Sequence, residues 1–159
     1  MVLVVVLLTG GQPSFAQKDA KTKKSEKKEW VKKQIESGRY EIEVDKVTPA
    51  RGNTKHLSSD YSVKLKGDTV ISYLPYFGRV YSAPYGGSGG LDFTAPVTDY
   101  KLAYDKKGTA TIKFDAKTSE DTYAFVIQVF ENGSASVSVS SMNRQNILFH
   151  GELDDFDED

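Results

Sequence analysis

The 159-residue sequence contains no cysteine. This absence excludes disulfide bonds, thiolate catalysis, zinc sites with sulfur ligands and lipid attachment to a cysteine. The fold must therefore be stabilised by its hydrophobic core alone. A single domain of this length can bury enough surface for that purpose.

Histidine is scarce as well, and catalytic motifs are absent. His56 and His150 are the two histidines, and neither lies in a metal-binding or nucleophile-activating spacing. The glycine-rich run from 86 to 90 lacks the Lys-Ser or Lys-Thr of a phosphate-binding loop. Carboxylates are plentiful, but no acid–base pair can be singled out. We therefore expect no catalytic residues, no metal and no cofactor, and we interpret the chain as a non-enzyme.

Long apolar runs are absent too. The longest, Val2 to Leu8, has seven residues, whereas roughly 20 are needed to span a bilayer. Ser14-Phe15-Ala16 follows it, and a short apolar core before small-x-small residues is typical of a secretory signal. No Lys or Arg precedes the run, so the usual charged start is missing. We predict a signal peptide over residues 1–16; the alternative is a buried N-terminal strand.

Charge is unevenly distributed, although the net charge is only −1. Residues 17–33 hold eight lysines against three acids, which gives +5, and residues 152–159 hold six acids and no base. The region between them is neutral, so it offers no basic stripe for nucleic acid. We predict a Lys-rich tether over 17–25, one domain over 26–153 and an acidic tail over 154–159.

One helix is predicted at the start of this domain. Trp30, Val31 and Ile35 fall on one face of a helix of about three turns that begins near Glu26. Ser25 is a suitable N-cap, and Gly38 suits the position just after the end. The apolar stripe is narrow, so the helix should dock on another element.

The residue pattern in the rest of the chain predicts strands and turns. Apolar and polar residues alternate from Tyr40 to Asp45, from Tyr61 to Leu65 and from Ala110 to Asp115. Turn residues recur at intervals of roughly one strand. The fold class is therefore mainly β: a curved, barrel-like antiparallel meander of about eight strands after one helix. A two-sheet β-sandwich is the alternative.

The register of the second half follows from the pattern. A four-residue loop at 118–121 places Phe114 opposite Phe125. A three-residue loop at 131–133 puts Val137 and Val139 on the core face, whereas a two-residue turn would bury serines there. The same loop type at 106–108 requires positive φ at Gly108 and Gly133. It predicts the pairs Tyr104–Ala110, Leu102–Ile112 and Tyr100–Phe114.

Five of the 18 aromatic residues lie within 13 positions, from Tyr73 to Tyr85. Pro75 and Pro84 interrupt strand pairing there, so the segment should form an edge or loop. Aromatic rings with an arginine suit contact with sugars, peptides or ring systems. We expect Tyr73 and Tyr81 to be packed and the others to be at least partly exposed. The candidate binding residues are Tyr76, Phe77, Arg79, Tyr81 and Tyr85; the alternative is that the rings only cover the end of a barrel.

Four stretches together resemble a known family: Ile71 to Gly87, Glu120 to Phe125, Glu131 to Val137 and Asn143 to Leu153. They are similar to the domain of unknown function 4251 family, whose members are mainly exported proteins of Bacteroides-group Gram-negative bacteria. The resemblance covers about 36–153. It implies a location in the periplasm or cell envelope, and it implies no assigned activity and no catalytic residues.

Three functional hypotheses follow. The first is a binding or scaffolding domain of the cell envelope, with an envelope protein or a glycan as partner. The second is a carrier that holds a small apolar ligand in a cavity lined by Tyr100, Leu102, Phe114 and Phe125. The third, a hydrolase, requires two carboxylates that converge in a cleft with raised pKa.

Export gives a direct prediction. If residues 1–16 are a signal peptide, the mature chain begins at Gln17 and fractionates outside the cytoplasm. Mass spectrometry of the protein purified from its native host should find Gln17 at the N-terminus. An intact Met1 would contradict this.

Overall fold

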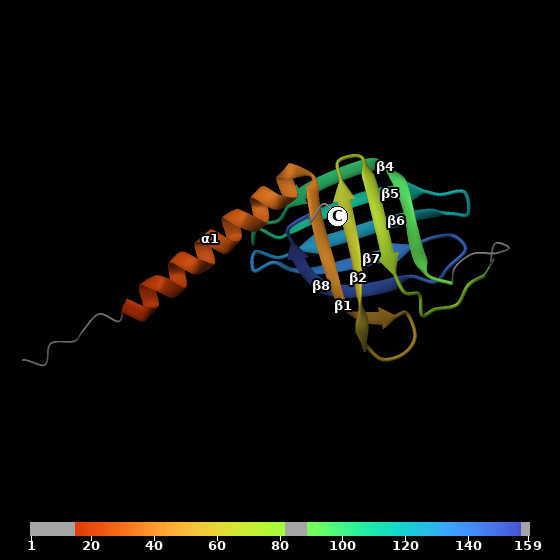
Figure 1. Ribbon diagram of the computed structural model, residues 1–159, viewed down its shortest axis with the longest axis horizontal. Coiled ribbons are helices and arrows are strands. Elements are labelled where there is room, and N and C mark those ends of the chain that lie inside the picture. Colours follow the sequence, from red (N-terminus) through yellow and green to blue (C-terminus); the bar gives the residue numbers. More distant parts are fainter. Residues whose placement is uncertain (1–14, 82–88, 157–159) are drawn as a thin grey trace, which may run out of the picture.

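The computed structural model describes residues 15–81 and 89–156. Eight antiparallel strands form a closed barrel, in which each strand pairs with the next and β8 returns to β1 (Figure 1). The predicted barrel-like meander after one helix is therefore confirmed. The elements are α1 (Phe15–Ser37), β1 (Arg39–Pro49), β2 (Lys55–Lys66), β3 (Thr69–Leu74), β4 (Leu91–Tyr104), β5 (Ala110–Lys117), β6 (Thr122–Val129), β7 (Ser134–Ser140) and β8 (Ile147–Asp154).

The register predicted for the second half is confirmed between β5, β6 and β7. Phe125 pairs with Phe114 on one side and with Val139 on the other. Both three-residue loops have the expected glycine geometry, with φ of 79° at Gly108 and 90° at Gly133. Burial of apolar rather than hydroxyl side chains therefore does select this register.

One predicted pair is wrong. Tyr104 and Leu102 lie opposite Ala110 and Ile112 as expected, but the register of β4 against β5 shifts between Thr98 and Lys101. Asp99 adopts φ of 53° there, and Tyr100 does not pair with Phe114. The shift comes just after the last pairs of β4 with β3, where β4 continues beside β5; a bulge bends a strand at such a point.

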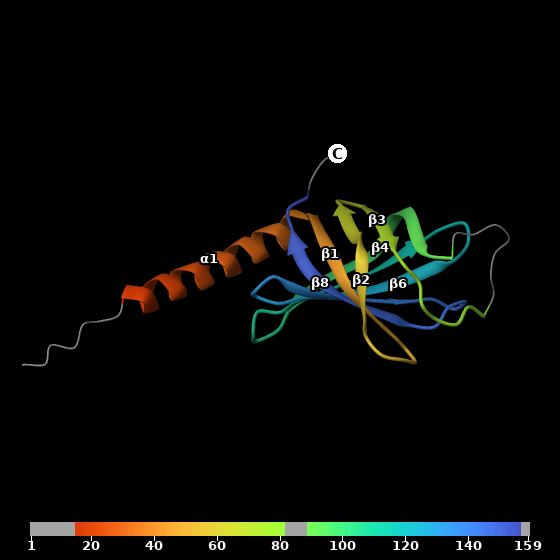
Figure 2. The same cartoon turned by 60° about the horizontal axis from the view of Figure 1, so that its bottom comes forward.

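Helix α1 is longer than predicted. It begins at Phe15, so Ser25 is not its N-cap and the stretch expected to be a tether is helical. Lysine, alanine, glutamate and glutamine favour helix, and no glycine or proline interrupts 15–37. Residues 19–29 are exposed, and this part of the helix projects away from the barrel (Figures 1 and 2).

The last turns of α1 dock on the barrel as predicted. Val31 and Ile35 are buried, and Trp30 packs against the core. The helix ends at Ser37, and Gly38 follows with φ of 68°. The amide of Gly67, in the β2–β3 turn, donates to the carbonyl of Gly38 over 2.9 Å. The helix is thereby held at one end of the barrel.

Aromatic side chains fill the barrel interior. The rings of Phe114 and Phe125 stack with their centroids 4.9 Å apart, and the rings of Phe93 and Tyr123 stack at 4.8 Å. Tyr100, by contrast, is 41% exposed. The four residues proposed to line a carrier cavity therefore do not enclose one, because two of them pack face to face and Tyr100 reaches solvent.

The closure between β1 and β8 contains a second irregularity. The register of β1 shifts between Val44 and Lys46 against both of its neighbours. Gly151 lies opposite Val44, and a Cβ atom at Gly151 would overlap the carbonyl oxygen of Glu43. The close approach of the two backbones thus requires a residue without a side chain.

Replacing Gly151 with alanine should therefore lower the free energy of unfolding by about 2 kcal/mol or more, because the backbone of β1 must move. Gly89→Ala is the matched control: a Cβ there meets nothing within 4 Å, so the change should stay within about 0.5 kcal/mol. Urea denaturation of both variants measures the difference. Equal midpoints would contradict the close approach.

Tyr40 is the largest fully buried side chain, and it lies at the end of the barrel that α1 covers. Its hydroxyl has no hydrogen-bond partner that meets normal geometry within the described part of the chain. Burial, and then the neighbouring Tyr100, raises the pKa of Tyr40 well above its ordinary value. The phenol is therefore held neutral in the folded state.

This shift predicts a loss of stability at alkaline pH. As pH rises above about 10, Tyr40 ionises first in the unfolded chain, so the folded state loses stability until the folded pKa is passed. Tyr40→Phe should differ from the wild type by about 1 kcal/mol or less at neutral pH and lose less stability between about pH 9 and pH 11. Urea unfolding across this range tests it. Parallel curves for the two proteins would refute the linkage.

Candidate binding surface

The predicted aromatic segment crosses the end of the barrel opposite α1. Strand β3 ends at Leu74, since Pro75 has no N–H to continue the ladder. The segment then lies against the connection between β7 and β8. The amide of Tyr81 donates to the carbonyl of Asn143 over 2.7 Å, and the amide of Gln145 donates to the carbonyl of Arg79 over 3.0 Å. Two connections far apart in sequence thus form one unit.

Tyr76 joins the two connections from beneath. Its hydroxyl lies 2.8 Å from the carbonyl oxygen of Gln145 and 3.0 Å from that of Arg79. A Cβ at Gly78 would fall 2.6 Å from this hydroxyl oxygen, so glycine lets the turn pass close to the end of the Tyr76 side chain. Burial raises the pKa of Tyr76, although the bond to Gln145 and the charge of Arg144 oppose the rise. The hydroxyl therefore remains a donor at physiological pH.

Arg144 supports the same unit and is only 8% exposed. Its guanidinium carbon lies 5.1 Å from the centre of the Tyr76 ring, a cation–π distance. One guanidinium nitrogen lies 3.4 Å from the carbonyl oxygens of both Gly89 and Gly90, just before β4. The planar cation thus links the start of β4 to the β7–β8 connection.

Above this framework, apolar side chains face solvent. Tyr81 is 63% exposed, Phe77 40%, Val80 37% and Met142 93%. Arg79 is exposed beside them. We call Phe77, Arg79, Val80, Tyr81 and Met142 the aromatic end surface. Side chains of this kind presented on a bonded framework are typical of a contact surface, because little conformational freedom is lost on binding.

The candidate residues from the sequence are largely brought together here. Phe77, Arg79 and Tyr81 are exposed, whereas Tyr76 is half-buried and supports the others. The expectation that Tyr73 and Tyr81 are packed is wrong: Tyr73, at 48% exposed, points outward because Ser72 and Leu74 face the core. It packs instead beside Tyr61, with ring centroids 5.3 Å apart. Tyr85 lies outside the described residues.

Sequence reasoning missed the contribution of the β7–β8 connection. Met142, Arg144 and Gln145 lie more than 55 positions from the aromatic segment, and nothing in the local pattern connects them to it. One signal was present: Met142 is the single apolar residue in a polar stretch, where it has no core to enter.

Apart from the aromatic end surface, a depression lies on the outer face of the barrel beside the irregularity between β1 and β2. Its volume is about 420 Å³, and five of its lining residues are acidic. Desolvation, followed by repulsion from Asp154 and other carboxylates, raises the pKa of Glu43. Glu43 is exposed, however, and Glu41 is paired with Lys64 at 3.1 Å. Within the described ranges, no group of His, Asp or Glu side chains is arranged to hold a metal ion. The acidic lining residues are Glu41, Glu43, Asp45, Asp60 and Glu152.

Comparison with known proteins shows to which family the chain is related. The family described as "Domain of unknown function (DUF4251)" matches residues 22–153. The chain belongs to the DUF4251 family. Its barrel is similar to the crystal structure of a DUF4251 family protein from Bacteroides eggerthii, with 16% identity, a TM-score of 0.64, and coverage of 81% of this chain and 87% of that one. No curated protein matches the chain.

The family relationship confirms the resemblance drawn from the sequence, and the similar crystal structure supports the fold of this DUF4251 chain. The match begins at residue 22, within α1, so part of the helix lies inside the family region. Among the residues that the structure describes, no helix has the length and apolar character needed to cross a membrane.

Proposed function

We propose that this DUF4251 protein is a non-enzymatic binding or scaffolding domain of the bacterial cell envelope. The aromatic end surface is its contact site. The observation that carries the proposal is the exposure of Phe77, Tyr81 and Met142 on a framework fixed by Tyr76 and Arg144. A barrel stabilised by its own core has no need to expose these groups.

Several features favour a macromolecular partner such as an envelope protein or a glycan. The surface lies over a filled interior, so a ligand would contact it from outside. Tyr81 offers its ring, Phe77 offers a ring over which the Lys55 ammonium lies 5.0 Å from the centroid, and Arg79 offers a planar donor group. Such a set suits a flat, partly polar contact, in which aromatic residues and arginine supply most of the binding energy.

Site-specific photo-crosslinking in the native host tests the proposal. A photoreactive phenylalanine at Tyr81 should give a discrete adduct in the envelope fraction. The same group at Tyr100 should give no such adduct. Tyr100 is also an exposed tyrosine, but it lies at the end of the barrel near α1. Phe77→Ala with Met142→Ala should reduce the adduct at position 81 by about tenfold or more.

Stability provides the control. Tyr81→Ala should change the free energy of unfolding by about 1 kcal/mol or less, because the ring is mostly exposed. A loss of roughly 3 to 5 kcal/mol would instead assign the ring to the core and remove the basis of the proposal. Failure of position 81 to crosslink, or equal crosslinking from Tyr100, would also refute it.

A further inference from the structure

The opposite end of the barrel contains a groove between α1 and two β-hairpins. It is lined by Lys28, Val31, Lys32, Tyr104, Gly108 and Glu131, and its volume is about 270 Å³. We call it the helix–hairpin groove. Its size is close to the lower limit for small-molecule sites. It is distinct from the aromatic end surface, since β4 runs from one end of the barrel to the other between them.

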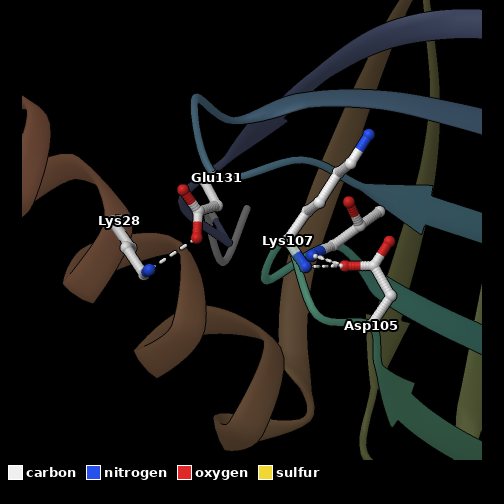
Figure 3. Close-up of polar contacts among 5 residues, drawn as sticks. Lys28, Asp105, Lys107 and Glu131 are labelled. Atoms are coloured by element: carbon white, nitrogen blue, oxygen red, sulfur yellow. Dashed lines mark hydrogen bonds and ion pairs between the residues drawn. The ribbon is translucent and has the colours of Figure 1, made fainter.

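The walls of this groove are fixed by local bonding. In the β4–β5 loop, the Asp105 carboxylate accepts hydrogen bonds from the amides of Lys107 and Thr109, at 2.8 and 2.9 Å (Figure 3). Gly108 completes the loop, and a side chain there would collide with the carboxylate of Glu131. The loop is therefore fixed by its own hydrogen bonds, and its glycine gives the Glu131 carboxylate room beside it.

The groove combines an apolar interior with cationic groups. Val31 and the half-exposed ring of Tyr104 supply apolar surface. Lys28 reaches from α1 to Glu131, with 2.5 Å between the ammonium and a carboxylate oxygen (Figure 3). A lysine ammonium has three donors, so this pairing leaves two for a ligand.

Lys32 follows Lys28 by four positions and so lies on the same side of the helix. Its pairing with Glu36 is long, at 3.8 Å, and both side chains are more than half exposed. An exposed pair of this kind contributes little stability and gives way readily to a better anion. The lining residues carry two positive charges and one negative charge, and Glu36, the weakly held partner of Lys32, lies outside the lining.

We propose that the helix–hairpin groove binds a small monoanion with an apolar body, such as an aryl or alkyl carboxylate or sulfonate. The apolar body packs between Val31 and Tyr104, and the anionic group accepts from Lys28 and Lys32. The ion pair of Lys28 with Glu131 orients the ammonium toward the groove before the ligand enters. Binding connects α1 to both hairpins and so stabilises the docked helix.

The chain contains its own reporter for this site. Trp30 is the single tryptophan, and it precedes Val31 in the docked part of the helix. The probe is 1-anilinonaphthalene-8-sulfonate, an aromatic monoanion whose emission rises in apolar surroundings. Titration of the folded protein should give saturable energy transfer from Trp30 to the probe. N-phenyl-1-naphthylamine, which has the same aromatic body without the sulfonate, should bind at least about tenfold more weakly.

Matched variants assign the binding to the groove. Lys28→Gln with Lys32→Gln should weaken binding of the sulfonate probe about tenfold or more, whereas Lys33→Gln, an exposed lysine that does not line the groove, should leave it within about twofold. Tyr104→Ala should weaken both probes. Urea unfolding of each variant verifies that it is folded.

The results that overturn the proposal are equally specific. They are absence of saturable transfer at about 1 mM probe, equal affinity of the two probes, or unchanged binding after both lysines are replaced. Loss of binding in Phe77→Ala with Tyr81→Ala would place the probe on the aromatic end surface and would refute the groove. Because that double variant leaves the groove intact, the groove and the proposed envelope function can fail independently.

Discussion

The close approach of β1 and β8 at Gly151 is the constraint on which the remaining structure depends. A meander of eight strands becomes a barrel only if its first and last strands pair, and here they pair across a shift in the register of β1. The backbone of Glu43 lies where a side chain of residue 151 would be. Without that contact, β1 and β8 would be two free edges, each an open template for pairing with other chains.

Closure also determines where function can lie. Once the sheet is closed and its interior is filled by rings such as Phe114 and Phe125, ligands are left with the outer face and the two ends. Helix α1 docks at one end, and the connections after β3 and β7 cover the other. Both candidate sites arise where a segment from outside the sheet meets the strand ends. A cysteine-free chain can have such sites because its stability comes from the barrel and not from the loops.

The sequence predicted those parts of the fold in which one strong preference dominates. Alternation determines the register of β5 against β6. Between β6 and β7, Gly133 as third loop residue agrees with it, because a slip would bury serines in place of Val137 and Val139. Prediction from the sequence failed where the structure depends on contacts between residues far apart in the chain. The bulge at Asp99 lies just past the last pairs of β4 with β3, and Tyr81 is held by a backbone hydrogen bond to Asn143. Neither contact can be inferred from local pattern.

The helix was predicted too short because the lack of an apolar stripe was taken as a lack of helix, whereas residues of high propensity extend α1 into solvent.

The two ends of the barrel differ in a way that bears on how the domain works. At the aromatic end, the exposed groups lie on a framework in which buried Arg144 and the Tyr76 hydroxyl are satisfied by backbone carbonyls, so the surface is pre-organised. At the other end, the groove exists only while α1 is docked, since Lys28, Val31 and Lys32 belong to the helix. A ligand there would act on the helix that precedes the barrel, whereas a partner at the aromatic end would meet a surface that does not depend on it. This asymmetry follows from a closed barrel that has a helix at one end only. The two proposed roles, contact with a partner and control of the helix, would thereby be separated along the length of β4.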